Sequence, residues 1–290
     1  MHIVTDSGTD LHLPPEELAS LNIHVVPLTI TLDGKSYQEG IDIEPEDFYQ
    51  LLAASKNLPT TSQPAPGDFA ELYRRLAATD PDILSIHISS GLSGTVNSAR
   101  TAVEIVPEAR VTLVDTKTLS AASGWEVTAA ARAARAGWPL ERILDLLAEI
   151  RAQSESVYTL RDLTHLIHGG RISHMKGLVA SLLNIKPLIG VEKEKGVYEQ
   201  LGQARAFTKA MRGLVDLMAK KHAPGSKLRV QVLHSNDPEA AGLLAEQVAE
   251  RFDCDWQPAG RISLALGAHS GPTMVGVAYA PADLFAQIPA

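Results

Sequence analysis

Cysteine, aromatic residues and long apolar runs are all scarce in this sequence. Cys254 is the single cysteine among 290 residues, which excludes an internal disulfide and any metal site built on paired cysteines. The most apolar segment, residues 178–191, is interrupted by Asn184, Lys186 and Pro187. It therefore falls short of the roughly 18 uninterrupted apolar residues that a membrane span requires, and we expect no stable membrane insertion.

Positive charge is also in short supply. The chain carries 26 Lys and Arg against 34 Asp and Glu, with a formal net charge of -8. Such a chain has no general attraction for phosphate backbones or anionic membrane surfaces, so we expect no nucleic-acid partner. The first residues, Met1 to Asp6, lack the basic start and the apolar stretch of a signal peptide, which predicts a cytoplasmic protein.

Familiar catalytic motifs are absent as well. Neither the Gly-x-Gly-x-x-Gly fingerprint nor a Walker phosphate loop occurs, which argues against a nucleotide-binding enzyme. Residues 91–95 are not a Gly-x-Ser-x-Gly nucleophile elbow, because the second glycine stands one place too early. A serine hydrolase with Ser93 as nucleophile, His269 as base and Asp115 or Asp162 as the orienting acid stays open as an alternative, since this chain order matches that of α/β hydrolases.

What the sequence does contain is an alternation of short β-rich runs with stretches of helical spacing, the pattern of parallel sheets with crossover helices. Its length favours two domains. We predict a first α/β domain over residues 1–153, with a doubly wound and mainly parallel sheet, and a second α/β domain over residues 154–290. In the first domain the expected strands cover residues 3–6, 23–31, 83–88 and 111–115. The expected helices there cover residues 14–21, 45–55, 67–78, 120–136 and 140–151.

The pattern of the second domain differs from that of the first. A short helix, the pair Gly169-Gly170 and a further helix should follow the first strand, and a hairpin should come next. The expected strands and hairpin cover residues 157–160, 186–200, 228–233 and 273–279. The two long helices cover residues 206–221 and 238–251.

Four clusters of small polar residues, glycines and single charges lie at predicted strand ends or helix starts, where open α/β sheets bind ligands. The clusters are residues 59–67, 89–95, 169–173 and 267–272. Taken singly, each also fits a structural role: a proline-bounded turn, a helix cap, a surface arginine and a loop histidine without special function. The second cluster has the strongest chemistry, because free N–H groups at a helix start beside a serine hydroxyl can bind a carboxylate or a phosphate.

Together and in this order, the four clusters resemble the DegV family, which includes the fatty-acid-binding subunits of bacterial fatty acid kinase. That family carries a Thr-Ser-Gln-Pro loop, a Ser-Ser-Gly-x-Ser-Gly-Thr loop, Gly-Gly-Arg-Ile-Ser and a Gly-x-His-x-Gly loop, and this sequence has all four. The opening Thr5-Asp6-Ser7 and the later Asp115-Thr116-Lys117 are similar too. The resemblance extends over nearly the whole chain.

The resemblance implies a protein that buries a long-chain fatty acid. It implies that Thr61 and Ser93 hold the carboxylate, with Ser62, the Gly94 amide and His269 as neighbours in the same network. Burial of about fourteen methylene groups would contribute on the order of 10 kcal/mol before ordering costs, so the tail would supply the affinity. Hydroxyl and amide donors would orient the carboxylate without a full ion pair, which suits a group that must later react.

The resemblance also implies partners. Arg171 matches a family arginine near the pocket mouth, and Arg205 matches one associated with partner or acyl-phosphate handling. The implied partners are a fatty acid kinase and possibly an acyltransferase; the chain itself would be non-catalytic and need no cofactor. A lipid store or regulator without a kinase stays open as an alternative. Two positions depart from the family pattern: Thr273 follows the histidine loop, and Phe207 stands where a basic residue is common.

Three histidines invite a comparison with metal sites. His165 and His168 are spaced to share one helix face, and His174 lies nearby. Histidines without a supporting carboxylate pattern are more often solvated than bound to metal, so we expect no metal site here.

Overall fold

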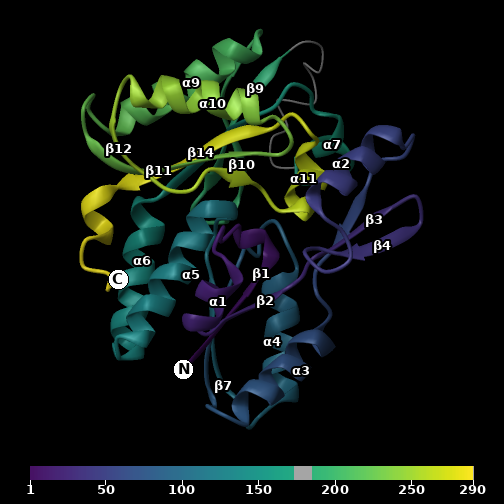
Figure 1. Ribbon diagram of the computed structural model, residues 1–290, viewed down its shortest axis with the longest axis vertical. Coiled ribbons are helices and arrows are strands. Elements are labelled where there is room, and N and C mark those ends of the chain that lie inside the picture. Colours follow the sequence, from purple (N-terminus) through teal and green to yellow (C-terminus); the bar gives the residue numbers. More distant parts are fainter. Residues whose placement is uncertain (173–184, 290) are drawn as a thin grey trace.

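The computed structural model describes residues 1–172 and 185–289, arranged as two layered α/β halves (Figure 1). The helix expected after Gly170 lies outside the described residues. A parallel sheet forms the lower half in Figure 1, a larger mixed sheet forms the upper half, and two helices lie between them. Within the described residues no helix is both long and apolar enough to cross a bilayer.

The first sheet has the strand order β2-β1-β6-β7 and is parallel throughout, with helices on both faces. Successive residues of a strand face opposite sides, so Ile3 and Val4 of β1 enter two different clusters of the core. Both are fully buried, as expected for a parallel sheet covered on both faces. The doubly wound fold is confirmed. Its strands are β1 (His2–Asp6), β2 (Ile23–Val26), β6 (Asp82–His87) and β7 (Arg110–Asp115).

Short helices and two long ones surround this sheet. Helices α3 and α4 cover one face through Phe69, Tyr73 and Ala99, which pack beside Val4. The helical elements are η1 (Ser7–Thr9), α1 (Pro15–Ser20), α2 (Pro45–Ala54), α3 (Pro66–Ala77), α4 (Thr95–Ile105), α5 (Ser120–Arg135) and α6 (Leu140–Gln153).

The single strand expected over residues 23–31 is wrong: the chain makes two strands there, in two different sheets. Strand β2 ends at Val26, and β3 (Thr29–Leu32) pairs antiparallel with β4 (Lys35–Gln38) and β5 (Thr60–Ser62). The break falls at Pro27, which has no N–H for a sheet ladder, and the next N–H, that of Leu28, donates to Ser7 Oγ instead. Residues 60–62, expected in a turn, form β5 instead, an edge strand that pairs with β3.

Helices α5 and α6 join the two halves. Helix α5 contacts β1 and β6 of the first sheet and β8 and β14 of the second. Trp125 Nε1 on α5 donates a 2.9 Å hydrogen bond to Gln231 Oε1 on β11. One hydrophobic core consequently runs through both halves. The proposed boundary at residue 153 coincides with the end of α6, but the independence of the two halves as domains stays a prediction.

The second sheet follows the order β10-β9-β8-β14-β11-β12, with β13 also beside β11, and most of its pairs are antiparallel. The expected hairpin is confirmed as β9 and β10. Helices α9 and α10 cover its outer face, as Figure 1 shows. The strands are β8 (Glu155–Thr159), β9 (Lys186–Glu192), β10 (Val197–Ala204), β11 (Lys227–His234), β12 (Asp253–Trp256), β13 (Gly260–Arg261) and β14 (Val275–Pro281). The helices are α7 (Thr164–His168), α9 (Phe207–Lys221), α10 (Pro238–Ala249), α11 (Leu264–Ser270) and η2 (Ala282–Phe285).

Candidate functional site

Four segments distant in sequence meet around one hollow between the two halves. Strand β5 brings Thr61 and Ser62, the loop from β6 to α4 brings Ser93, and α11 brings His269. Arg171 joins them from the segment that follows α7. Five of the seven residues singled out from the sequence therefore line a single cavity.

Thr61 and His269 contact each other directly across this hollow. Thr61 Oγ1 and His269 Nε2 are 2.6 Å apart. Burial lowers the pKa of His269 to about 4, helped by the positive charge of Arg171, so the ring is neutral at neutral pH. The other ring nitrogen, Nδ1, is buried and has no hydrogen-bond partner within the described part of the chain. A buried N–H is orphaned less often than a buried acceptor, which favours the proton on Nε2 and leaves the Thr61 hydroxyl free to donate to a ligand.

His269 was expected in a tight loop, and this was wrong: it lies in the last turn of helix α11. Ser263 caps the other end of the helix, its Oγ accepting from Leu266 N at 3.2 Å. The glycines that suggested a loop serve close packing instead. A Cβ on Gly267 would lie 2.3 Å from the Tyr49 hydroxyl, and one on Gly169 would lie 2.1 Å from His269 Nδ1.

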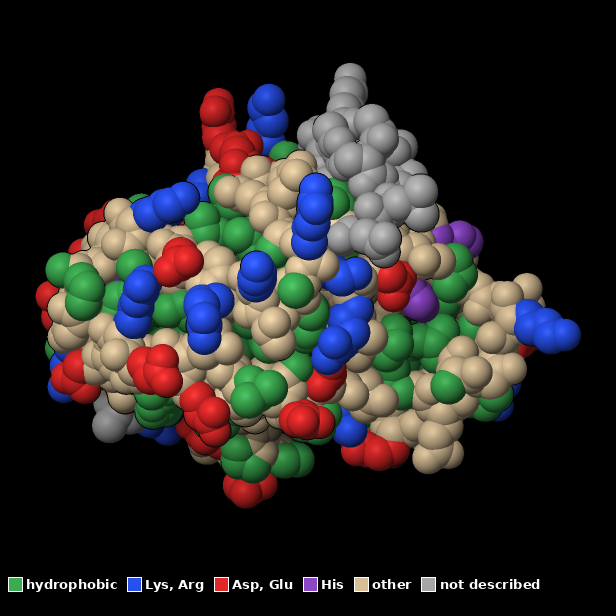
Figure 2. Space-filling view, turned by 90° about the horizontal axis from the view of Figure 1, so that it is seen from above, with side chains coloured by type: hydrophobic (Ala, Val, Ile, Leu, Met, Phe, Trp, Pro, Cys, Tyr) green, Lys and Arg blue, Asp and Glu red, His purple; other side chains and the backbone are tan. Residues whose placement is uncertain are grey.

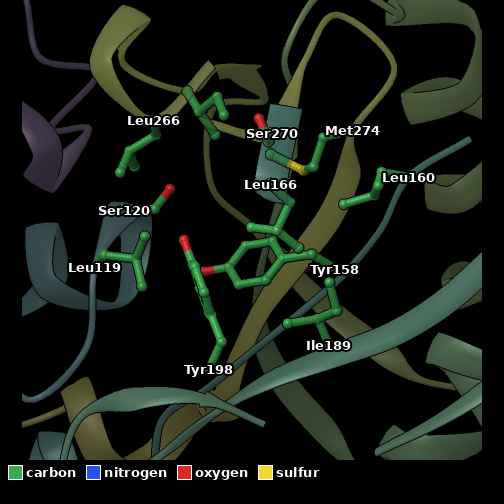
Figure 3. A pocket seen from close by; sticks show the side chains of 11 residues that line it. Leu119, Ser120, Tyr158, Leu160, Leu166, Ile189, Tyr198, Leu266, Ser270 and Met274 are labelled. Carbon is green, nitrogen blue, oxygen red and sulfur yellow. The ribbon is translucent and has the colours of Figure 1, made fainter. Parts of the chain in front are cut away.

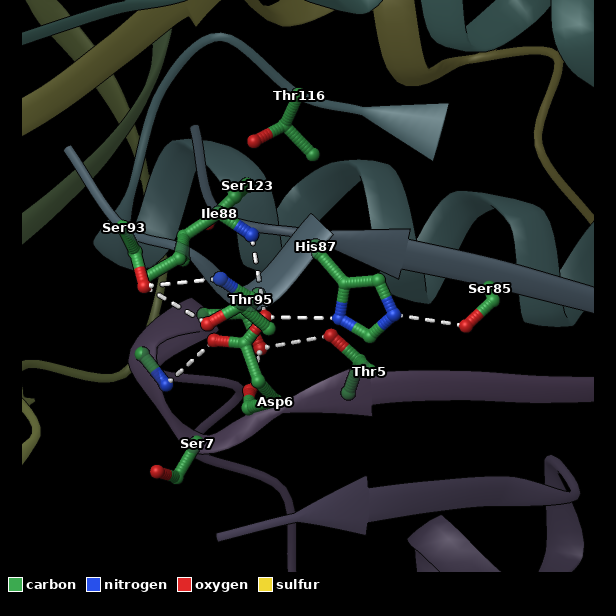
Figure 4. Close-up of polar contacts among 12 residues, drawn as sticks. Thr5, Asp6, Ser7, Ser85, His87, Ile88, Ser93, Thr95, Thr116 and Ser123 are labelled. Atoms are coloured by element: carbon green, nitrogen blue, oxygen red, sulfur yellow. Dashed lines mark hydrogen bonds and ion pairs between the residues drawn. The ribbon is translucent and has the colours of Figure 1, made fainter. Parts of the chain in front are cut away.

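Ser93 lies at the start of helix α4, as the sequence suggested. Its Oγ lies 2.8 Å from Thr95 Oγ1 and accepts a 3.3 Å hydrogen bond from Thr95 N (Figure 4). The buried Thr95 hydroxyl can donate to Ser93, which leaves the Ser93 proton for a ligand. Gly94 is the N-cap of α4 and has no side-chain cap. It lies behind the lining, where a Cβ would stand 2.9 Å from the Gln63 amide, so glycine lets the two loops approach.

Arg171 supplies the positive charge of the site. Gly170 before it has a φ of 73°, a left-handed conformation that favours glycine and turns the chain toward the hollow. Arg171 Nε donates to Leu92 O at 3.4 Å, and a terminal nitrogen donates to Gly169 O. Arg205, in contrast, is exposed just before α9 and does not line this hollow.

A second, mainly apolar hollow adjoins the first (Figure 3). Leu119, Tyr198 and Leu266 line both, so one cavity leads from hydroxyl and guanidinium groups to hydrocarbon walls. The remaining lining residues come from β8, β9, α7 and the segments beside them, and from α5 and α11. The sequence interpretation missed the mainly apolar ones, because each is an ordinary residue of a strand or helix or of a segment next to one. Only their convergence in space marks them: Tyr158, Leu160, Leu166, Ile189 and Met274.

The hydrolase alternative finds no assembled triad in this structure. His269 Nε2 bonds Thr61 rather than Ser93. Asp115 accepts from Ser90 and pairs with Lys117 at 2.9 Å, while Asp162 accepts from Thr164 N at 3.0 Å.

A hydrogen-bonded Asp-His-Ser series does exist, but it lies inside the first half (Figure 4). Asp6 Oδ2 is 2.9 Å from His87 Nδ1, and His87 Nε2 is 2.7 Å from Ser85 Oγ, which in turn bonds the Tyr73 hydroxyl. The Asp6 and His87 side chains have 0% exposure, so no substrate reaches them. This series of hydrogen bonds connects β1, β6 and α3 beneath the Ser93 loop, and its role is structural.

The other sequence candidates have local explanations. His165 is half-buried and His168 exposed, His174 lies outside the described residues, and the described part of the chain holds no group of three ligands placed for a metal. Phe207, which stands where the family often has a basic residue, is buried in the core of the second half, with the Arg161 guanidinium 4.0 Å from its ring centre. Thr273 Oγ1 accepts from Arg161 N at 3.2 Å, which fixes the turn before β14.

The fold and the site define a two-layered α/β protein in which a polar hollow with hydroxyl donors opens into an apolar one. The chain belongs to the DegV family: the family model described as "Uncharacterised protein, DegV family" matches residues 1–282. A DegV domain-containing protein of Listeria innocua is 34% identical over 279 residues, covering 96% of this chain and 97% of the relative.

Solved structures agree with this assignment. A structure described as "Fatty Acid Binding of a DegV family Protein from Thermus thermophilus" is 31% identical with a TM-score of 0.84, covering 97% of this chain and 99% of that one. DegV from Bacillus subtilis, described as a fatty acid binding protein, is 29% identical with a TM-score of 0.86, covering 96% and 98% of the two chains. The predicted family and fold class are thus confirmed.

Proposed function

We propose that this protein binds a long-chain fatty acid, with the carboxylate on Thr61 and Ser93 and the tail in the apolar hollow. The observation that carries the proposal is the shared wall of Leu119, Tyr198 and Leu266, which joins a hollow with free hydroxyl donors to one lined by hydrocarbon. The fatty acid binding stated for the Thermus and Bacillus relatives supports the same ligand class.

The chemistry of the polar hollow suits a carboxylate that must be held but remain reactive. Thr61 can accept a hydrogen bond from His269, and Ser93 can accept from Thr95, so each can direct its own proton at the ligand. The Arg171 guanidinium adds positive charge nearby while two of its nitrogens remain on backbone carbonyls. A carboxylate in this environment keeps its charge without a direct bidentate clamp.

The proposal extends to a partner: the protein presents its fatty acid to a fatty acid kinase, which phosphorylates it to an acyl phosphate, and has no catalysis of its own. The family resemblance supports this step. Arg171 would lie at the pocket mouth and Arg205 on the docking surface. Arg205 is exposed together with Lys209 and Arg212 of α9. Figure 2 looks onto this side of the molecule, where Lys and Arg side chains project from the surface.

Mass spectrometry of an organic extract tests the ligand. We expect a fatty acid in a near one-to-one amount from the wild type and strong depletion from the double variant Thr61→Ala with Ser93→Ala. Thr60→Ala is the matched control, because Thr60 is an exposed neighbour on the same strand and does not line the hollow. A wild type that stays empty after incubation with fatty acids would contradict the proposal.

Formation of acyl phosphate with ATP and a cognate fatty acid kinase tests the partner. Arg205→Ala should retain its fatty acid, because this side chain is outside the cavity. The variant should lose most of the turnover, because Arg205 would lie on the docking surface for the kinase. If the loaded wild type gives no acyl phosphate, the protein is a lipid store or regulator. That result would contradict the proposed kinase partner and leave the proposal of fatty-acid binding unaffected.

A further inference from the structure

The apolar hollow contains one polar group that fatty-acid binding alone does not explain. Tyr158, on strand β8, lines the hollow and is only 6% exposed. Its hydroxyl oxygen is buried and has no hydrogen-bond partner among the residues that the structure describes. In Figure 3 the hydroxyl points away from β8 into the hollow, toward the side where Tyr198 and Leu119 lie. A hydroxyl in such surroundings needs a water or a ligand as its partner, because leaving it unpaired is costly.

The neighbouring polar groups do not satisfy Tyr158. Ser120 Oγ donates to Asp10, and Ser270 Oγ is engaged with Ser235 Oγ at 3.1 Å. The Ser156 hydroxyl, two residues earlier on β8, lies close enough to oppose the rise in the pKa of Tyr158, but within the described residues neither hydroxyl has a hydrogen-bond partner within 3.5 Å. Burial raises the pKa of Tyr158 well above its ordinary value, and Ser156 opposes this only in part, so the hydroxyl keeps its proton.

We infer that Tyr158 forms a subsite for an oxygen on the acyl chain, so that the protein selects a fatty acid with a hydroxyl group remote from its carboxylate. This inference rests on the proposed function, because it places the carboxylate in the polar hollow and the chain beside Tyr158. A tyrosine hydroxyl can both donate to and accept from a chain hydroxyl. A plain chain would displace any water from the hollow and leave Tyr158 unpaired, so the protein would discriminate against it.

Competition between matched lipids tests the inference. Wild type, Tyr158→Phe and Tyr49→Phe are each incubated with equimolar stearic acid and one hydroxystearic acid, in a positional series from the carbon next to the carboxyl group to mid-chain. The bound ratio is read by mass spectrometry. Tyr49→Phe is the matched control, because it also removes a buried hydroxyl without a hydrogen bond, outside both hollows.

We expect the wild type to favour a mid-chain isomer about fivefold to tenfold, the yield of one hydrogen bond, and not the isomer hydroxylated beside the carboxyl group. Tyr158→Phe should lose this preference and Tyr49→Phe should keep it. Equal binding of all isomers and stearic acid, or a preference that survives in Tyr158→Phe, would overturn the subsite and leave fatty-acid binding intact. Failure of the wild type to bind either lipid would overturn both proposals.

Discussion

Two buried carboxyl groups hold the start of the helix that carries His269, and they make stability depend on pH. Asp10 accepts from Ser263 N at 2.7 Å and from the Ser120 hydroxyl. Glu39 accepts from Leu264 N and, at 2.7 Å, from Ser7 Oγ. Burial raises the pKa of each to about 8, more than these hydrogen bonds lower it. The negative charge of Asp6 adds to the rise in the pKa of Asp10, and that of Asp10 adds to the rise in the pKa of Glu39.

The sign follows from comparing the folded and unfolded chains. In the unfolded chain both groups lose their protons near pH 4, whereas in the folded chain they keep them until about pH 8. Their stabilising contribution is fully present below pH 4 and is lost as the pH rises through 8. The lowered pKa values of His165, His234 and His269 act in the opposite direction, but only below about pH 6.5, where an unfolded histidine takes up a proton.

Between pH 6.5 and 8 the carboxyl groups therefore dominate. The free energy of unfolding should fall across this window by about 1 to 2 kcal/mol for each group. The assay is urea unfolding of the wild type, Glu39→Gln and Asp10→Asn at half-unit steps of pH, with exposed Glu71→Gln as the control. Asparagine suits position 10, where φ is 46°. Both variants should show a shallower fall and exceed the wild type in stability at pH 8. A wild-type stability that is flat or rises over this window would refute the reasoning, as would an unchanged slope in Glu39→Gln.

Three substitutions test the packing that surrounds the site. Gly169→Ala places a methyl 2.1 Å from His269 Nδ1, so the ring must move, and calorimetry should show about fivefold to tenfold weaker fatty-acid binding. Gly242→Ala is the control. It lies in open space on α10 and should leave binding unchanged while raising stability by about 0.5 to 1 kcal/mol. His87→Ala leaves Asp6 and Ser85 without a shared partner and should cost about 3 kcal/mol or more in urea unfolding; a loss below 1 kcal/mol would contradict the structural role. Gly124→Ala places a methyl 2.4 Å from Thr9 O, where α5 meets η1. We expect a lower melting temperature, from a loss of stability of about 1 to 3 kcal/mol. A melting temperature equal to that of the wild type would show that this contact adapts freely.

The sequence predicts the parallel sheet well because local signals suffice there. Ile3 and Val4, like the apolar run that ends at Ile88, need only be buried on both faces to be recognised as strands. The transfer of the chain to another sheet at Pro27 was missed, although a proline inside a β-rich run is a local signal that the strand ends or lies at an edge. His269 was misplaced for a different reason. Glycines at positions 267 and 271 indicate a loop locally, whereas Gly267 is required by Tyr49, a residue more than two hundred positions away.

The same distinction applies to the site and suggests how its two halves cooperate. The hydroxyl and guanidinium groups could be named from their motifs, but their shared hollow forms only where four segments distant in sequence meet, and α11 is one of them. That helix is held at its start by Asp10 and Glu39 of the first half, and near its end His269 meets Thr61 of the same half. Both ends of an element from the second half are thus bonded to the first. Because the helix is short and hydrogen-bonded along its length, a displacement at its start would be transmitted to His269. The carboxylate site and the contact between the halves should therefore be lost together, so the isolated first half would keep Thr61 and Ser93 but lose the partner that orients the Thr61 hydroxyl.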